Sequence, residues 1–143
     1  MSARKTPYLV FVSHSSQDTW LARKVAQEIE RCGAKSFLDE EEIEAGADFE
    51  DEILSALNDA AEFLVLLTPW ALDRPYVWAE SGVAWGRKIP ITGALLGMTP
   101  ASLQARPDVH LFLKKRNLIP LNQIDTYFAQ LTKRVRTAKN PHP

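Results

Sequence analysis

The hydrophobic positions of this 143-residue chain follow two alternating patterns. Short continuous apolar runs have the length and composition of strands that are buried on both faces. The longer segments between them carry an apolar residue at every third or fourth position, which is the period of an amphipathic helix. The five predicted strands are Tyr8–Ser13, Lys35–Asp39, Glu62–Thr68, Ile89–Leu96 and Leu118–Leu121.

Capping residues and glycines indicate where the helices begin and end. The first helix follows the segment S-S-Q-D and ends near Gly33, which suits the left-handed position after a helix. Asp48 is predicted to cap the second helix, and Asn122 the last. A short helix is expected over 77–87, after a segment that two prolines interrupt. The inward stripes of the first, second and last helices are Leu21, Val25 and Ile29; Phe49, Ile53 and Leu57; and Ile124, Phe128, Leu131 and Val135.

Strands that alternate with helices form right-handed βαβ units and a parallel sheet. The spacing of these five strands predicts an α/β, flavodoxin-like fold of three layers. Its sheet has five parallel strands in the order 2-1-3-4-5, with helices on both faces. The length corresponds to a single domain over residues 1–143, with a core over about 7–135 and a flexible tail over 136–143.

A sheet of this order also predicts where a ligand binds. Ligands lie beyond the carboxyl ends of the strands, where the winding reverses between the first and third strands. The segments 13–18, 39–48 and 68–80 all leave the sheet at that edge. Helix starts there offer unpaired N–H groups and a partial positive charge, which suit phosphate or pyrophosphate. The glycine motifs of Rossmann dehydrogenases and P-loop NTPases do not occur, which argues against both classes.

Composition narrows the class of protein further. The net charge of -1 gives no reason to expect binding to nucleic acid or to an anionic membrane. Cys32 is the only cysteine, so no internal disulfide can form, which fits a reducing compartment. The N-terminal apolar run is too short for a signal peptide or a membrane span, and a cytoplasmic location is expected. The acids over 39–44 lack the spacing of a calcium loop, and no metal is expected.

The charges are unevenly distributed along the chain. Nine of the eighteen acidic residues lie between Asp39 and Glu52, with no lysine or arginine among them. The C-terminal segment is basic, with no acid after Asp125. Two interpretations stay open at this point. The charges form either two solvated faces or complementary surfaces for head-to-tail self-association.

Three segments, in order and at suitable separations, resemble the Toll/interleukin-1 receptor (TIR) domain. YLVFVSHSSQD resembles the family's first motif, F-[IV]-S-[YH]-S-x-x-D. FLDEEEIEAGADFEDEILSAL resembles the bacterial and plant form of the loop and helix after the second strand. FLVLLTPWALDRPYVWAES resembles the third-strand segment, in which an aromatic residue precedes a glutamate with the spacing W-x-x-x-E. The resemblance covers about Pro7 to Val135.

This resemblance implies one of two classes of function. Some TIR domains are adaptors that act only by assembly. Others, in plants, bacteria and some animal proteins, cleave NAD+ at the nicotinamide–ribose bond. In the second class the glutamate of the W-x-x-x-E spacing is catalytic, which implies this role for Glu80. Tyr76 stands where the family usually has tryptophan, and Trp78 follows two residues later. Substrate contacts are implied for Ser13, His14, Ser15, Phe37, Asp39, Trp70 and Tyr76.

One carboxylate is sufficient for this chemistry. Nicotinamide leaves as a neutral group, and the transition state is an oxocarbenium ion on the ribose, which a carboxylate stabilises as in glycoside hydrolysis. The expected enzyme is an NAD+ glycohydrolase or ADP-ribosyl cyclase that uses NAD+ as substrate and needs no cofactor. Its expected context is bacterial antiphage signalling, with self-association through TIR–TIR contacts and a separate effector or sensor.

Alternatives to this enzyme also fit the sequence. A glutamate in the first turn of a helix stabilises the helix dipole by roughly 0.3–1 kcal/mol without any catalytic role. A non-catalytic TIR adaptor would bind other TIR domains through the acidic loop after the second strand. An enzyme of the deoxyribosyltransferase kind also combines a parallel sheet with a carboxylate, which there acts as a covalent nucleophile.

Overall fold

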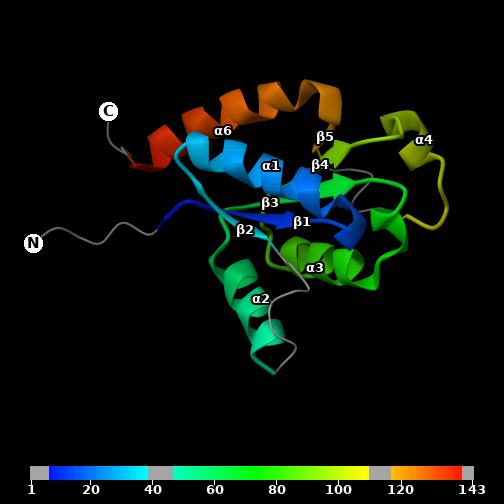
Figure 1. Ribbon diagram of the computed structural model, residues 1–143, viewed down its shortest axis with the longest axis horizontal. Coiled ribbons are helices and arrows are strands. Elements are labelled where there is room, and N and C mark those ends of the chain that lie inside the picture. The colour runs from blue at the N-terminus through cyan, green and yellow to red at the C-terminus, as the bar shows by residue number, and fades with distance from the viewer. Residues whose placement is uncertain (1–6, 39–46, 110–116, 140–143) are drawn as a thin grey trace, which may run out of the picture.

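The parallel sheet has the strand order that the sequence predicts. The computed structural model describes residues 7–38, 47–109 and 117–139. In it, five parallel strands lie in the order β2-β1-β3-β4-β5 (Figure 1). This order confirms the flavodoxin-like topology and places the reversal of winding between β1 and β3. The strands are β1 (Leu9–Ser13), β2 (Lys35–Leu38), β3 (Glu62–Leu67), β4 (Ile91–Leu95) and β5 (Asn117–Pro120).

Helices cover both faces of the sheet (Figure 1). Helices α1 (Thr19–Arg31) and α6 (Ile124–Lys139) pack on one face, and α2 (Ala47–Asp59) and α3 (Pro75–Gly86) pack on the other. The short helix α4 (Pro100–Gln104) follows β4. Every helix in the described ranges is too short or too polar to cross a bilayer. Single 3-10 turns precede α1, α3 and α6: η1 (Ser16–Asp18), η2 (Ala71–Asp73) and η3 (Leu121–Gln123).

Successive side chains of the strands point to opposite faces of the sheet and contribute to two separate hydrophobic cores. Val10 and Val12 of β1 pack with the inward residues of α1 and α6. Phe11, which lies between them, packs on the opposite face with α2 and α3. All six residues of β3 are buried because this central strand is covered on both faces. The continuous apolar runs in the sequence are the direct consequence of this double coverage.

A row of stacked rings crosses the sheet beneath α2 and α3. Phe11 lies opposite Phe37 of β2 and Phe63 of β3. Its ring centroid is 5.2 Å from that of Phe37 and 5.4 Å from that of Phe63. Such offset stacking adds to the stabilisation that comes from burial. Phe37 is therefore a packing residue of the sheet.

Several predicted helix boundaries differ from the structure. Helix α3 begins at Pro75, earlier than predicted, because proline interrupts a helix interior but is favoured at the first helical position. Asp48 lies inside α2, and Asn122 lies inside the turn η3, so neither is an N-cap as predicted. Helix α6 continues through Lys139, so the predicted flexible tail is helical in its first four residues. Gly33 does adopt the left-handed conformation expected of it, with φ of +94°.

Candidate functional site

The central polar contact of the site joins the end of β1 to α3. The Ser13 hydroxyl donates a 2.7 Å hydrogen bond to Glu80 Oε1. Both residues are buried, with Ser13 inaccessible and Glu80 only 3% exposed. A carboxylate is rarely buried to this extent without a partner that fixes it. The contact lies at the carboxyl end of β1, which is the edge where the topology predicts a ligand.

Glu80 occupies a different place in its helix from the one predicted. Because α3 begins at Pro75, Glu80 lies in the second turn and not in the first. A carboxylate there is beyond the N-terminal turn, where the helix dipole has its effect. Stabilisation of the helix start therefore does not explain this glutamate. The neighbouring Ser81 hydroxyl donates to the Val77 carbonyl within the helix, so Ser81 belongs to the helix interior.

A pocket of about 180 Å³ opens between α2 and α3 and includes Glu80 in its lining. Its walls are mostly apolar, and its outer rim includes the half-exposed Tyr76. Glu50 of α2 contributes a second carboxylate, and nothing in the sequence analysis singled out this residue. The lining residues are Glu50, Ile53, Leu54, Leu57, Tyr76, Ala79, Glu80 and Val83.

Two polar links hold the loop after β1 against the loop after β3. The Thr68 hydroxyl donates a 2.7 Å hydrogen bond to the buried Asp18 carboxylate and accepts one of 3.1 Å from the Ala71 amide. Arg74 Nη2 donates to the Ser16 hydroxyl at 2.7 Å. The first link is buried and the second is exposed. Together they fix the loops on either side of the Ser13–Glu80 contact.

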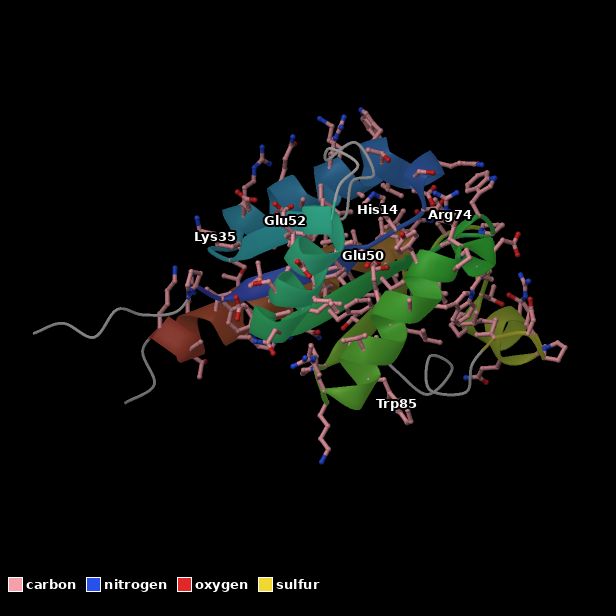
Figure 2. All side chains as sticks on the ribbon, turned by 90° about the horizontal axis from the view of Figure 1, so that it is seen from below. His14, Lys35, Glu50, Glu52, Arg74 and Trp85 are labelled. Carbon is pink, nitrogen blue, oxygen red and sulfur yellow. The ribbon has the colours of Figure 1, made fainter. Side chains whose placement is uncertain are left out.

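The start of α1 is less suited to a phosphate than the sequence suggests. Asp18 makes no side-chain cap hydrogen bond there, and its buried carboxylate places negative charge at the helix start. The Ser15 hydroxyl accepts a hydrogen bond from the Gln17 amide at 3.2 Å, so it already caps the turn η1. His14, directly before Ser15 in the chain, is 8% exposed and lies toward the same end of the molecule as Arg74 (Figure 2).

The remaining predicted contact residues do not all meet at the pocket. Tyr76 does, as described. Trp70 is 48% exposed on the loop after β3 and does not line the pocket. Phe37 is partly buried and stacks on Phe11 in the sheet, and its substrate contact stays a prediction. Asp39 and the acidic loop after it lie outside the described residues.

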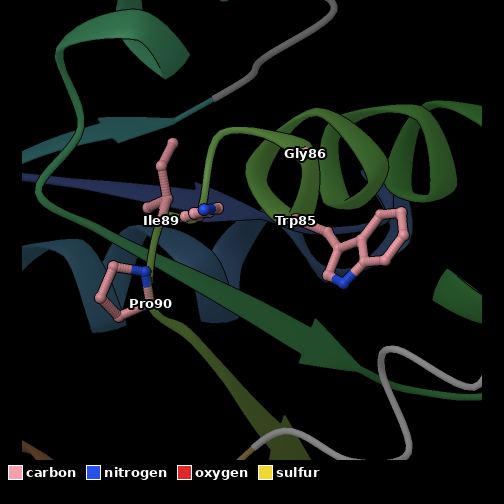
Figure 3. A pocket seen from close by; sticks show the side chains of 5 residues that line it. Trp85, Gly86, Ile89 and Pro90 are labelled. Atoms are coloured by element: carbon pink, nitrogen blue, oxygen red, sulfur yellow. The ribbon is translucent and has the colours of Figure 1, made fainter.

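A larger cavity, of about 410 Å³, lies at the other end of α3 and is a poorer candidate. It is lined by Trp85, Gly86, Lys88, Ile89 and Pro90, just ahead of β4 (Figure 3). This is the amino edge of the sheet, and none of the five lining residues is an acid. In the described parts of the chain, no three His, Cys, Asp or Glu side chains gather as they would around a metal ion.

A family model described as "TIR domain" matches residues 10–135 of the chain. The chain belongs to the TIR family. The TIR domain of the Toll-related receptor TRR-2 from Hydra magnipapillata is similar, with a TM-score of 0.64 and 19% identity over 89% of this chain and 97% of that one. The TIR domains of the activated Roq1 resistosome, which recognises the pathogen effector XopQ, give a TM-score of 0.58 and 14% identity over 90% of this chain and 84% of that one.

A prokaryotic SEFIR domain is also similar, with a TM-score of 0.60 and 15% identity over 90% of this chain and 92% of that one. A comparison with curated proteins gave no match. At these low identities the solved structures support the TIR fold and say nothing of activity.

Another buried carboxylate of this TIR domain lies at the opposite edge of the sheet from Glu80 and Asp18. Glu62, at the start of β3, is 5% exposed and accepts hydrogen bonds from the hydroxyls of Tyr8 and Tyr127. Arg134 of α6 binds it in a bidentate manner, with Nε at 2.6 Å and Nη2 at 3.0 Å. We refer to Tyr8, Glu62, Tyr127 and Arg134 as the Glu62 cluster.

The Glu62 cluster changes the titration of its members. Burial, followed by the hydrogen bond to Glu62, raises the pKa of Tyr8 to about 12. Burial is also the main reason why the pKa of Tyr127 is raised. The hydrogen bonds to Glu62 raise the pKa of Arg134, which keeps this guanidinium charged. Sequence reasoning missed the cluster, although an acid that begins an otherwise apolar strand was a signal that it needed partners.

Proposed function

We propose that this TIR domain is an NAD+ nucleosidase that cleaves the nicotinamide–ribose bond with Glu80 as its catalytic residue. One observation carries the proposal. The Glu80 carboxylate is almost fully buried, is fixed by the Ser13 hydroxyl at 2.7 Å at the carboxyl end of β1, and lines an apolar pocket between α2 and α3. Glu80 is also the glutamate that matches the W-x-x-x-E spacing of the NAD+-cleaving TIR domains.

The bond that breaks joins C1′ of the ribose to the ring nitrogen of nicotinamide. Its electron pair leaves with the nitrogen, so the positively charged ring departs as neutral nicotinamide. The positive charge moves to the ribose as an oxocarbenium ion, which the Glu80 carboxylate stabilises. Water then adds at C1′ and loses a proton to solvent, which gives ADP-ribose. Capture of the cation by the adenine ring gives a cyclic isomer, and capture by another nucleophile gives a conjugate.

The other residues of the site have supporting roles in this reaction. Ser13 orients the reactive carboxylate. Its hydroxyl is hydrogen-bonded to Oε1 of Glu80, and this bond also fixes the direction in which Oε2 of the same carboxylate points. Tyr76 offers a half-exposed ring at the rim of the pocket, against which a flat ring can stack. A small nucleotide product of this kind fits a signalling role, and we place the protein in the cytoplasm, in bacterial antiphage signalling with a separate effector or sensor.

An adaptor that works by TIR–TIR assembly is the second candidate function. Among the residues whose side chains the structure describes, four large aromatic side chains are about half exposed or more: Trp20 at 71%, Trp70 at 48%, Tyr76 at 47% and Trp85 at 52%. Exposed aromatic residues are enriched at protein–protein interfaces. The exposed aromatic residues support self-association of the domain. Because assembly and catalysis are compatible, they do not argue against catalysis, which needs a direct test.

The test is incubation of the concentrated protein with NAD+, followed by liquid chromatography and mass spectrometry. Glu80→Gln is the critical variant, because it keeps the size of the side chain and removes its charge. Glu52→Gln, on the exposed side of α2, is the matched control. Release of nicotinamide by the wild type and Glu52→Gln, but not by Glu80→Gln, supports the proposal. No consumption of NAD+ at any protein concentration would favour the adaptor, and a trapped glycosyl–enzyme adduct would favour a covalent mechanism.

A further inference from the structure

The pocket between α2 and α3 is built from two helical stripes with the same spacing. On α2 the lining residues are Glu50, Ile53, Leu54 and Leu57, and on α3 they are Tyr76, Ala79, Glu80 and Val83. Both sets follow i, i+3, i+4, i+7, which is the spacing of one helix face. Two packed helices normally present apolar residues at all such positions. Each stripe here contains one carboxylate instead.

Glu50 is therefore placed on the side of α2 that faces α3. Glu52, two residues later, is turned through about 200° by the helical geometry and lies on the other side of α2 (Figure 2). Only Glu50 of the two lines the pocket. Both glutamates are exposed, so each is tolerated where it stands without a structural partner being required.

The pocket has room for one aromatic ring and for little more. Its volume is about 180 Å³, and an apolar cavity of about 150 Å³ is known to hold benzene. Sites that enclose a whole ligand of drug size run from about 300 Å³ upward. The rest of a dinucleotide would therefore lie outside this pocket, toward the loops after β1 and β3.

The charge of the pocket favours a cationic ring over a neutral one. Among the described residues that line it, eight in number, none is basic, and two are carboxylates that approach from different helices. The half-exposed ring of Tyr76 lies at the same rim, and an aromatic face attracts a delocalised cation. A flat pyridinium ring satisfies the size, the apolar walls and both negative charges together.

We propose that Glu50 is a specificity-determining residue, which makes the pocket between α2 and α3 select a positively charged pyridinium ring over a neutral ring of the same shape. The inference rests on the proposed NAD+ cleavage and adds to it the recognition of the oxidised, charged form of the nicotinamide ring. The reduced dinucleotide carries a neutral ring and would bind more weakly.

The role of Glu50 differs from that of Glu80 in a way that kinetics can separate. The ring loses its positive charge as the bond to ribose breaks. Glu50 therefore stabilises the bound substrate more than the transition state, whereas Glu80 acts where the charge appears. Loss of ground-state binding raises KM without lowering kcat, and loss of an interaction made only in the transition state lowers kcat. Glu50→Gln should raise the KM for NAD+ about fivefold, as expected for a partly exposed ion pair.

The deciding experiment measures ring binding without catalysis. The ligands are nicotinamide methylated on its ring nitrogen, which is a cation, and nicotinamide, which is neutral. Their dissociation constants are obtained from NMR titrations of the wild type, Glu50→Gln and Glu52→Gln, with thermal unfolding as the check of folding. The wild type and Glu52→Gln should bind the cation about fivefold more tightly than nicotinamide, and Glu50→Gln should lose most of this preference, with only the part due to Glu80 and Tyr76 left.

The outcomes separate this inference from the proposed function. If the cation does not bind at millimolar concentration, or if Glu50→Gln keeps the preference of the wild type, the inference is wrong. If NAD+ is still cleaved in either of these cases, the proposed function stands without it. If the preference depends on Glu50 but NAD+ is not cleaved, the ring-selecting pocket stands and the proposed reaction falls.

Discussion

Removal of the Arg134 guanidinium from the Glu62 cluster should destabilise the fold. The Arg134 side chain is 41% exposed, and the expected loss is larger than for most side chains with that exposure. In Arg134→Met the apolar stem is largely kept, while Glu62 loses its counter-charge and two of the four hydrogen bonds that it accepts. Glu62 itself remains 5% exposed, so water cannot fully replace what is lost.

The size of the effect follows from the burial of the two partners. Breaking a fully buried pair by removing one partner costs about 3–5 kcal/mol. Exposed pairs contribute only about 0–1 kcal/mol, and the exposure of Arg134 requires a discount toward that value. We expect a loss of roughly 2–3 kcal/mol in the free energy of unfolding, which lowers Tm by roughly 5–10 °C in a domain of this size.

Urea unfolding followed by far-UV circular dichroism measures this loss. Arg136→Met, an exposed position on the same helix, is the control and should change the free energy of unfolding by less than about 0.5 kcal/mol. Glu62→Gln should destabilise the wild type but restore part of the stability of Arg134→Met, because the uncompensated charge is then gone. Equal effects of the two arginine substitutions, or no coupling in the double variant, would refute the reasoning.

Three other predictions follow from the polar contacts. Thr68→Val leaves the buried Asp18 carboxylate without its 2.7 Å donor and should lower the free energy of unfolding by about 1–3 kcal/mol. Urea unfolding measures this loss. An unchanged free energy of unfolding would mean that Asp18 does not depend on this contact. Ser13→Ala removes the donor to Glu80 and should lower kcat about tenfold with little change in KM for NAD+, and a change confined to KM would contradict the orienting role. The raised pKa of Tyr8, about 12, means that the unfolded chain releases this proton from about pH 10 while the folded chain keeps it, so stability should fall as the pH rises from 10 through 12. Unfolding in urea at pH 8 and pH 11 checks the last prediction. Tyr8→Phe should reduce the difference in stability between the two pH values, and the part that remains is due to Tyr127, whose pKa is also raised.

The strands and their order were predictable because burial on both faces leaves a strong signal. The three inner strands β1, β3 and β4 are almost entirely buried and mostly apolar, and α1, α2 and α6 have clear apolar stripes. The edge strands β2 and β5 are shorter and more exposed, and their signal is weaker. Boundaries were less predictable. Pro75 interrupts a helix in one context and begins one in another, and the sequence does not distinguish the two. That ambiguity shifted the helix start by two residues, about half a turn, and so moved Glu80 from the first turn into the second.

The partners of buried polar residues could not be predicted. Glu80 stood out from its spacing, but its bond to Ser13 joins positions 67 residues apart. The contacts of Glu62 span 54 to 72 residues. Local pattern carries no information on such pairs, because each depends on how two elements meet in space. Glu50, the second carboxylate of the pocket, could not be identified from the sequence either. It is one of nine acids between Asp39 and Glu52, and only the packing of α2 against α3 distinguishes it from the others.

The polar contacts at the two ends of β3 also specify how this strand aligns with its neighbours. The strand reads E-F-L-V-L-L, is buried on both faces, and so offers little alternation of polar and apolar residues to define its register. A slip of one residue moves the strand by about 3.3 Å, which exceeds the tolerance of a hydrogen bond. Such a slip would separate Glu62 from its hydrogen-bond partners at one end of β3 and Thr68 from Asp18 at the other. Each misaligned pairing would then leave buried polar groups unsatisfied at about 1–3 kcal/mol apiece. The contacts of Glu62 and Thr68 therefore fix the register of β3, whose apolar residues alone would be compatible with several registers.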